Sequence, residues 1–188
     1  PVSYELLGLA QELAAQLSEP VYAVIVGNDV RDGAEELVNR GADKVFLYDD
    51  PALAEFRDDP YTDVLARCCR EEKPSIFLIG ATSLGRSLGP RVAAKLNTGL
   101  TADCTYLDID PETGLLRQTR PAYGGNIMAT IITPRSRPQM ATVRYKMFPE
   151  AEKMDTPDGV VVEKTVDMSS VRDRVKVLGF DEAKEQIS

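Results

Sequence analysis

The 188-residue sequence contains no histidine and only three cysteines. Histidine is the side chain whose unperturbed pKa lies nearest neutrality, so its absence argues against Ser-His-Asp and Cys-His catalysis. The cysteines Cys68, Cys69 and Cys104 lack metal-ligand spacing, and no histidine can complete a zinc site. We therefore expect neither a triad hydrolase nor a zinc protein, and the unpaired thiols favour a reducing, cytoplasmic compartment.

Long apolar runs and an excess of positive charge are missing as well. The longest apolar runs, at 21–26 and 75–79, fall far short of the roughly 20 residues that cross a bilayer. The formal net charge is −8, which repels phosphate backbones. We therefore expect no membrane insertion and no nucleic acid as main partner. Nothing at Pro1 resembles a signal peptide, and we expect a fragment of a longer protein.

The first half of the chain alternates helical and strand patterns. A stripe of leucines three or four residues apart predicts the first helix, and the β-branched run 21–26 is typical of a strand buried on both faces of a parallel sheet. Gly41 is expected to end the second helix. The predicted elements are helix 2–17, strand 21–26, helix 30–40, strand 44–48, helix 60–72, strand 75–79 and a helix that ends near Asn97.

The pattern changes after Asn97. Short β-like segments separated by proline and glycine predict an antiparallel addition and not another crossover. These segments are 104–110, 115–120, 126–133 and 139–144, with one more short strand near 160–162. The fold class that follows is α/β, with a doubly wound, mainly parallel Rossmann-like sheet and appended antiparallel strands. Residues 1–168 form the predicted domain, and the charged segment 169–188 is a predicted linker.

A glycine-containing loop follows the strand at 75–79 and opens the next helix, which is where backbone N–H groups can bind an anion. It matches a Walker A pattern except that Arg86 replaces the lysine, and the carboxylates at Asp108 and Asp110 fall in the antiparallel segment. An alternative is a tight turn without any ligand. The candidate residues for an anion or nucleotide are Gly80, Ala81, Thr82, Ser83, Gly85 and Arg86.

A second candidate segment covers 120–126, where paired glycines permit close backbone approach and an aromatic side chain could meet a partner. The alternative is a glycine bulge between strands. Cys68 and Cys69 fall in a predicted helix, where their side chains diverge by about 100°, so structural thiols are expected. The candidate interface residues are Arg120, Tyr123, Gly124, Gly125, Asn126 and Arg144.

The stretch 80–103, GATSLGRSLGPRVAAKLNTGLTAD, closely resembles the signature of electron-transfer flavoprotein alpha subunits. Three further stretches are similar to the family and occur in its order: PVSYELLG at 1–8, RPAYGGN at 120–126 and RPQMATVR at 137–144. The resemblance implies a fold related to adenine-nucleotide alpha hydrolases. It also implies a strand ahead of the segment that starts at Pro1, near the middle of the sheet.

The resemblance implies a function as well. Family members pair with a beta subunit and shuttle electrons on FAD from flavin dehydrogenases such as acyl-CoA dehydrogenase to a redox acceptor. Residues 1–168 would be the N-terminal domain of the alpha subunit, and 169–188 would lead towards an absent FAD-binding domain. We therefore expect an electron-carrier subunit and not an enzyme, with FAD in the intact heterodimer and none on this fragment.

Two other functions stay open at this point. A stand-alone AMP- or ATP-binding protein would use the loop from Gly80 to Arg86. A regulatory or structural domain would bind only protein. Under the family reading, the loop is a vestigial or partner-facing anion site, and the segment at 120–126 together with Arg144 contacts the beta subunit or its nucleotide.

Overall fold

The computed structural model describes residues 1–122, 127–171 and 173–179. Four helices and two short 3₁₀ turns accompany nine strands in this part of the chain. The helices are α1 (Val2–Leu17), α2 (Arg31–Asn39), α3 (Asp58–Glu72) and α4 (Ser83–Leu96), and the 3₁₀ turns are η1 (Pro51–Leu53) and η2 (Met168–Ser170). The strands are β1 (Tyr22–Gly27), β2 (Lys44–Asp49), β3 (Ile76–Gly80), β4 (Leu100–Cys104), β5 (Tyr106–Ile109), β6 (Leu116–Pro121), β7 (Met128–Ile131), β8 (Gln139–Val143) and β9 (Val160–Glu163).

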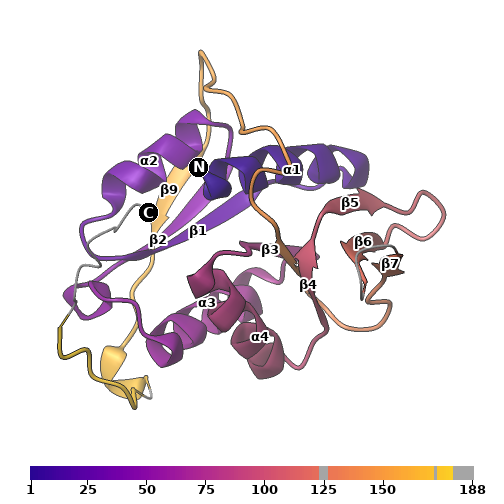
Figure 1. The fold of residues 1–188 in the computed structure, drawn as a ribbon. Coiled ribbons are helices and arrows are strands. Elements are labelled where there is room, and N and C mark those ends of the chain that lie inside the picture. Colours follow the sequence, from indigo (N-terminus) through magenta and orange to yellow (C-terminus); the bar gives the residue numbers. More distant parts are fainter. Residues whose placement is uncertain (123–126, 172, 180–188) are drawn as a thin grey trace, which may run out of the picture.

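Two parallel three-stranded sheets form the centre of the fold, with strand orders β1-β2-β9 and β3-β8-β4. Helices cover both faces, as Figure 1 shows. On β1, Ile25 packs towards Leu7 and Leu37 of α1 and α2, whereas Val24 packs towards Leu65 of α3. This alternation confirms the doubly wound α/β class, because each strand buries side chains on both faces.

The antiparallel sheet β5-β6-β7 confirms the predicted addition, but the prediction was wrong for the last of its strands. Residues 139–143 form β8, which pairs in parallel with both β3 and β4. The chain therefore leaves this sheet after β4, forms the antiparallel sheet, and returns as β8 between β3 and β4. All five β8 residues are buried, so this strand occupies a sheet centre, which the short β-like pattern did not distinguish from an edge. Strand β4 was not predicted, because the predicted segment 104–110 corresponds chiefly to β5, whereas β4 is a separate strand that pairs with β8 in parallel.

Within the described residues, β1 pairs only with β2, and β3 pairs only with β8. A cavity of about 790 Å³ separates the two unpaired edges, with α1 on one side and α3 on the other. The Val21 and Gly27 carbonyl oxygens accept hydrogen bonds from the N–H groups of Asp43 and Asp50, which shows that alternate backbone groups of β1 point away from β2. On β3, the Ser75 carbonyl accepts from Gln139 and the Ala81 N–H donates to Val143, so alternate groups of β3 likewise point away from β8. The groups that face the cavity belong to Tyr22, Val24 and Val26 on β1 and to Ile76, Leu78 and Gly80 on β3.

This cavity explains a difference from the sequence analysis. The run 23–26 reads as a fully buried strand, yet all four residues are only half-buried. The sequence therefore has the composition of a central strand, while the described chain leaves β1 at an edge.

The remaining local predictions fit the structure. Gly41 follows α2 with a φ of +90°, the left-handed conformation in which glycine has no steric penalty. Lys73 and Asn97 end α3 and α4 in the same conformation. No helix in the described segments is long and apolar enough to cross a membrane.

The cavity predicts unequal costs for two leucine truncations. Leu116 is fully buried in the cluster around Cys104 and Val143, so Leu116→Ala is expected to lower the free energy of unfolding by about 2–5 kcal/mol. Leu78 already borders the cavity and is half-buried, so Leu78→Ala should cost clearly less. Urea denaturation followed by circular dichroism measures both. Equal losses would mean that the cavity is closed in solution.

Candidate functional site

The loop between β3 and α4 is built by close backbone packing. Thr82 caps α4, since its Oγ1 accepts a hydrogen bond from the Gly85 N–H at 3.1 Å. A Cβ on Gly85 would lie only 1.9 Å from the Gly80 carbonyl oxygen, and one on Gly80 would lie 2.8 Å from the Val2 side chain. Both glycines are therefore required by the packing of strand against helix.

The Arg86 side chain turns back onto the protein. Its Nε donates to the Ala81 carbonyl oxygen at 3.0 Å, and its guanidinium donates to Asp103 Oδ1, also at 3.0 Å. Its side chain nevertheless remains more than half exposed. Arg86 thus links the start of α4 to the end of β4 by hydrogen bonds, while part of its side chain still faces solvent.

Asp103 joins this arginine to a second one. Arg144, directly after β8, donates to Asp103 Oδ2 at 2.6 Å, and its backbone N–H donates to the Cys104 carbonyl oxygen. Asp103 itself has a φ of +63°, and its N–H donates to Thr142 Oγ1. Three chain segments therefore meet at one carboxylate, at the carboxyl ends of β3, β4 and β8. We call Arg86, Asp103 and Arg144 the arginine bridge.

The charges of the bridge stabilise one another. The hydrogen bond from Arg144 lowers the pKa of Asp103, and the positive charges of Arg144, Arg86 and Arg120 lower it further. The same hydrogen bond raises the pKa of Arg144. The bridge thus keeps its ions at neutral pH, with more positive than negative groups on a chain whose net charge is −8.

The predicted interface residues divide between this site and the rest of the chain. Arg144 is in the bridge, and Arg120, at the end of β6, lies close enough for its charge to act on Asp103. Residues 123–126, with Tyr123, Gly124, Gly125 and Asn126, lie outside the described residues. The loop residue Ser83 begins α4 and is exposed.

Sequence reasoning missed three residues of this surface. Asp103 closed the quoted signature stretch but received no role, because its left-handed backbone and its two arginine partners depend on tertiary structure. Leu84 and Tyr145 are about half exposed, at 54% and 52%, and adjoin the loop and Arg144 in the chain. Side-chain exposure follows from the fold, so no sequence pattern indicated Leu84 or Tyr145.

The other chemical candidates have structural roles. Asp108 pairs with Arg117 across the β5-β6 ladder, and Asp110 accepts the N–H groups of Glu112 and Thr113 in the hairpin turn. Neither carboxylate therefore faces the Gly80 loop as a magnesium ligand would. No group of metal-ligating side chains occurs among the described residues.

The three cysteines are buried and unpaired. Burial raises the pKa of Cys69 to about 12 and that of Cys104 to about 11, and it also raises the pKa of Cys68. Thiols with such pKa values stay protonated near neutrality, and the thiolate is the reactive form. These cysteines serve packing.

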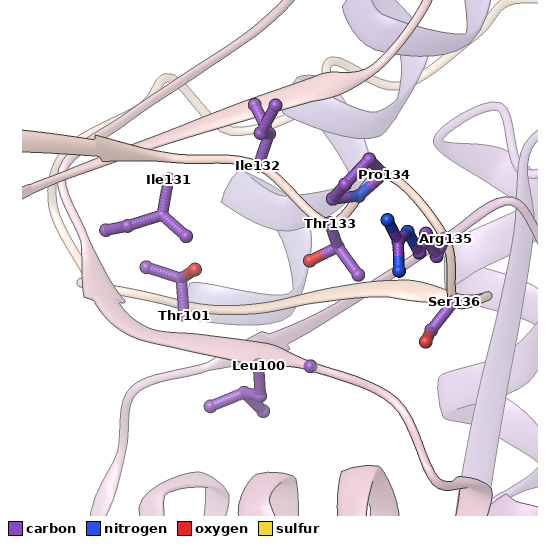
Figure 2. A pocket seen from close by; sticks show the side chains of 9 residues that line it. Leu100, Thr101, Ile131, Ile132, Thr133, Pro134, Arg135 and Ser136 are labelled. Atoms are coloured by element: carbon purple, nitrogen blue, oxygen red, sulfur yellow. The ribbon is translucent and has the colours of Figure 1, made fainter.

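A second, shallower cavity of about 340 Å³ lies between the start of β4 and the connection from β7 to β8. Figure 2 shows Ile131 and Thr133 opposite Leu100 and Thr101, with Arg135 at one end. It shares no lining residue with the Gly80 loop or the arginine bridge. The surface at the carboxyl ends of β3, β4 and β8 carries the arginine bridge and exposed apolar residues. It is therefore a stronger candidate for the functional site than this shallow cavity.

Adding a methyl group to the loop should be costly. Gly85→Ala would place Cβ against the Gly80 carbonyl, so α4 must shift, and we expect the free energy of unfolding to fall by at least about 1–3 kcal/mol. Gly179→Ala is the matched control, because nothing lies within 4 Å of its Cβ position. Thermal unfolding of both variants measures the effect, and equal stabilities would contradict the packing role.

The bridge also predicts a pH dependence. Because the pKa of Asp103 is lowered by folding, its contribution is present above the ordinary aspartate pKa and is lost as pH falls through the lower folded value. Asp103→Asn should therefore flatten the acid side of the stability curve below about pH 4. Asparagine tolerates the left-handed backbone, and Asp158→Asn at an exposed loop is the control. Unchanged acid dependence would show that the bridge does not form.

Comparison with known proteins shows which family the chain belongs to. A family model described as "Electron transfer flavoprotein domain" matches residues 1–169. The electron transfer flavoprotein subunit alpha of Megasphaera elsdenii is 49% identical over 89% of this chain and 50% of its own length, and that of Thermoanaerobacterium thermosaccharolyticum is 45% identical over 100% and 57%. The LctC subunit of the NAD⁺- and ferredoxin-dependent lactate dehydrogenase of Acetobacterium woodii is 48% identical over 95% and 42%.

The chain thus spans about half the length of these curated relatives. The matched region includes β3, α4 and β8, and with them the Gly80 loop and the arginine bridge. Sequence similarity of this extent, over an α/β fold of the expected class, identifies the family. The chain belongs to the electron transfer flavoprotein domain family, and its relatives support the predicted resemblance to alpha subunits.

Proposed function

We propose that this chain is the N-terminal scaffold domain of an electron-transfer flavoprotein alpha subunit. With a beta subunit, the intact protein would carry electrons on FAD from dehydrogenases to a redox acceptor in the cytoplasm. The observation that carries the proposal is the family match over residues 1–169, in a region that includes the arginine bridge. Relatives named as electron transfer subunits point to the same general role.

The side chains of the described region support a scaffold more than a catalyst. The thiols have raised pKa values, and the carboxylates Asp103, Asp108 and Asp110 are held by arginines or by a turn. These groups stabilise the fold and do not expose a base or nucleophile poised near neutrality. The redox chemistry would belong to FAD, which transfers electrons when bound.

The Gly80 loop does not fit the pyrophosphate of a dinucleotide well. The Gly85 N–H at the start of α4 already donates to Thr82 Oγ1, and Arg86 is turned towards Ala81 and Asp103. A phosphate cradle instead directs free N–H groups and a cation at the ligand. This geometry supports the proposal that the fragment holds no FAD of its own.

The surface around the bridge is suited to a protein partner. It combines Arg86, Arg144, Leu84 and Tyr145, and arginine and tyrosine are enriched at the energetic centres of interfaces. We propose that this surface, with Arg120 and residues 123–126, contacts the beta subunit or a nucleotide that it holds. The excess positive charge favours an anionic group opposite.

The interface is tested with the full-length alpha subunit and its cognate beta subunit. Arg144→Gln removes one partner of Asp103 and a cation of the surface, so we expect the dissociation constant to rise about tenfold or more by calorimetry. Arg135→Gln, beside the shallower cavity, should leave affinity unchanged. If both variants bind like the wild type, the partner surface lies elsewhere.

A companion measurement separates this proposal from a stand-alone nucleotide-binding protein. The purified chain is denatured, and released FAD, AMP and ATP are quantified by chromatography. We expect none of them at stoichiometric level. Stoichiometric AMP or ATP would favour the nucleotide-binding alternative, and stoichiometric FAD would contradict the assignment of flavin binding to another part of the protein.

A further inference from the structure

After β9, the chain runs the length of α3 in the opposite direction. Lys164 Nζ lies 3.0 Å from Glu71 Oε2 and 2.9 Å from Glu72 Oε1, at the C-terminal end of α3. Ten residues later, Arg174 donates two hydrogen bonds, of 2.7 and 2.9 Å, to the Asp59 carboxylate at the start of α3. The contacts therefore progress from one end of the helix to the other.

Between these ends, polar and apolar contacts both follow this order. The Arg67 guanidinium donates to Ser170 Oγ at 2.7 Å, near the middle of α3. Val166 and Met168 pack against the cluster that contains Tyr48, Leu53, Val64 and Cys68, and Val171 is buried. The described residues of the segment 164–174, which are all but 172, are thus docked by apolar side chains in the first part and chiefly by charges at the end. We call this segment the strap; Figure 1 shows it leaving β9 in orange and yellow.

The last contacts of the strap are two ion pairs. Asp173 Oδ2 accepts from Arg57 at 2.5 Å, and Arg57 also donates to the Ala52 carbonyl oxygen beside η1. Arg174 meets Asp59 in a bidentate pair, the geometry in which an arginine holds a carboxylate most specifically. Beyond Arg174, Val175 and Leu178 are exposed, at 59% and 91%, whereas Val177 is half-buried. Among the described residues, up to residue 179, Arg174 is the last strap residue whose side chain forms an ion pair with α3.

This end point lies at the same edge of the fold as the arginine bridge. The first residue of α3, Asp58, accepts a hydrogen bond from Ser87 Oγ at 2.6 Å, and Ser87 is in the first turns of α4. Since α4 begins at the Gly80 loop, the start of α3 and that loop are neighbours. The strap thus carries the chain from the far end of α3 back to the carboxyl edge of the sheets.

We propose that the strap is an electrostatic latch that delivers the chain to this edge, and that the point of articulation for any following part lies beyond the Arg174 ion pair. The two ion pairs hold the strap's end on α3. Exposed pairs of this kind contribute little energy each and are screened by salt. The two ion pairs therefore hold the end of the strap on α3 and direct the chain, but they are weak enough to dissociate.

Trypsin tests the end point on the 188-residue chain. The bond after Lys176 should be cut before the bond after Arg174, because Asp59 holds the Arg174 side chain. Asp59→Asn should speed cleavage after Arg174 about two- to fivefold, as should salt near 1 M, where the Debye length is about 3 Å. Asp158→Asn is the control. Mass spectrometry at early times reads both sites. Equal cleavage after Arg174 and Lys176 in the unmodified chain would overturn the latch.

Thiol cross-linking tests the delivery to the carboxyl edge. Leu178→Cys is combined with Leu84→Cys at the start of α4, or with Lys73→Cys at the far end of α3. Leu178 can reach about 14 Å beyond Arg174, whereas α3 is about 22 Å long. A short bismaleimide should therefore link 178 to 84 and not to 73, and the buried native cysteines should contribute little. A link to 73, to both positions or to neither would contradict the proposal.

A charge exchange shows whether the ion pair is responsible. In the 178/84 cysteine pair, Asp59→Arg should reduce cross-linking severalfold, and adding Arg174→Asp should restore it by recreating the pair with reversed signs. Cross-linking that Asp59→Arg leaves intact, or that the second change does not rescue, would overturn the role of this pair.

Discussion

The parallel insertion of β8 between β3 and β4 is the constraint on which the rest of the structure depends. This strand is buried throughout, and it returns from a separate antiparallel sheet to complete the second parallel sheet. Its position brings Arg144 to the carboxyl edge, and Thr142 fixes the Asp103 backbone beside it. Without this insertion, the two arginines and the aspartate of the bridge would not meet in the fold.

The carboxyl edge combines rigid packing with exposed charge. Gly80 and Gly85 bring strand and helix into close backbone contact, and in the loop that resembles a phosphate cradle the Gly85 N–H and the Arg86 side chain bond to the protein itself. The charge that such a loop would offer to a ligand is instead shared between Arg86, Asp103 and Arg144. A surface of this kind favours recognition of a partner over capture of a free nucleotide, which agrees with a scaffold role.

The C-terminal part of the described chain leaves the domain close to this same edge. The predicted linker begins at 169, yet ordered contacts with α3 continue to Arg174. The apolar anchor Val171 and the ion pairs at Arg57 and Asp59 together set where the chain leaves the domain. The site proposed for the beta subunit and the exit of the chain thus lie on neighbouring helices, so that a following part would start beside the subunit interface.

The sequence by itself determined the helices, the first parallel strands, the turn at Gly41 and the family, because these depend on local periodicity, backbone stereochemistry and contiguous motifs. Only the tertiary structure decided that 139–143 is a central strand, that β1 and β3 border a cavity, and that Asp103 joins Arg86 to Arg144. Hydrophobic pattern shows that a strand is buried but not which strands flank it. Pairing partners and ion pairs between residues 41 positions apart follow from chain topology, which no local pattern encodes.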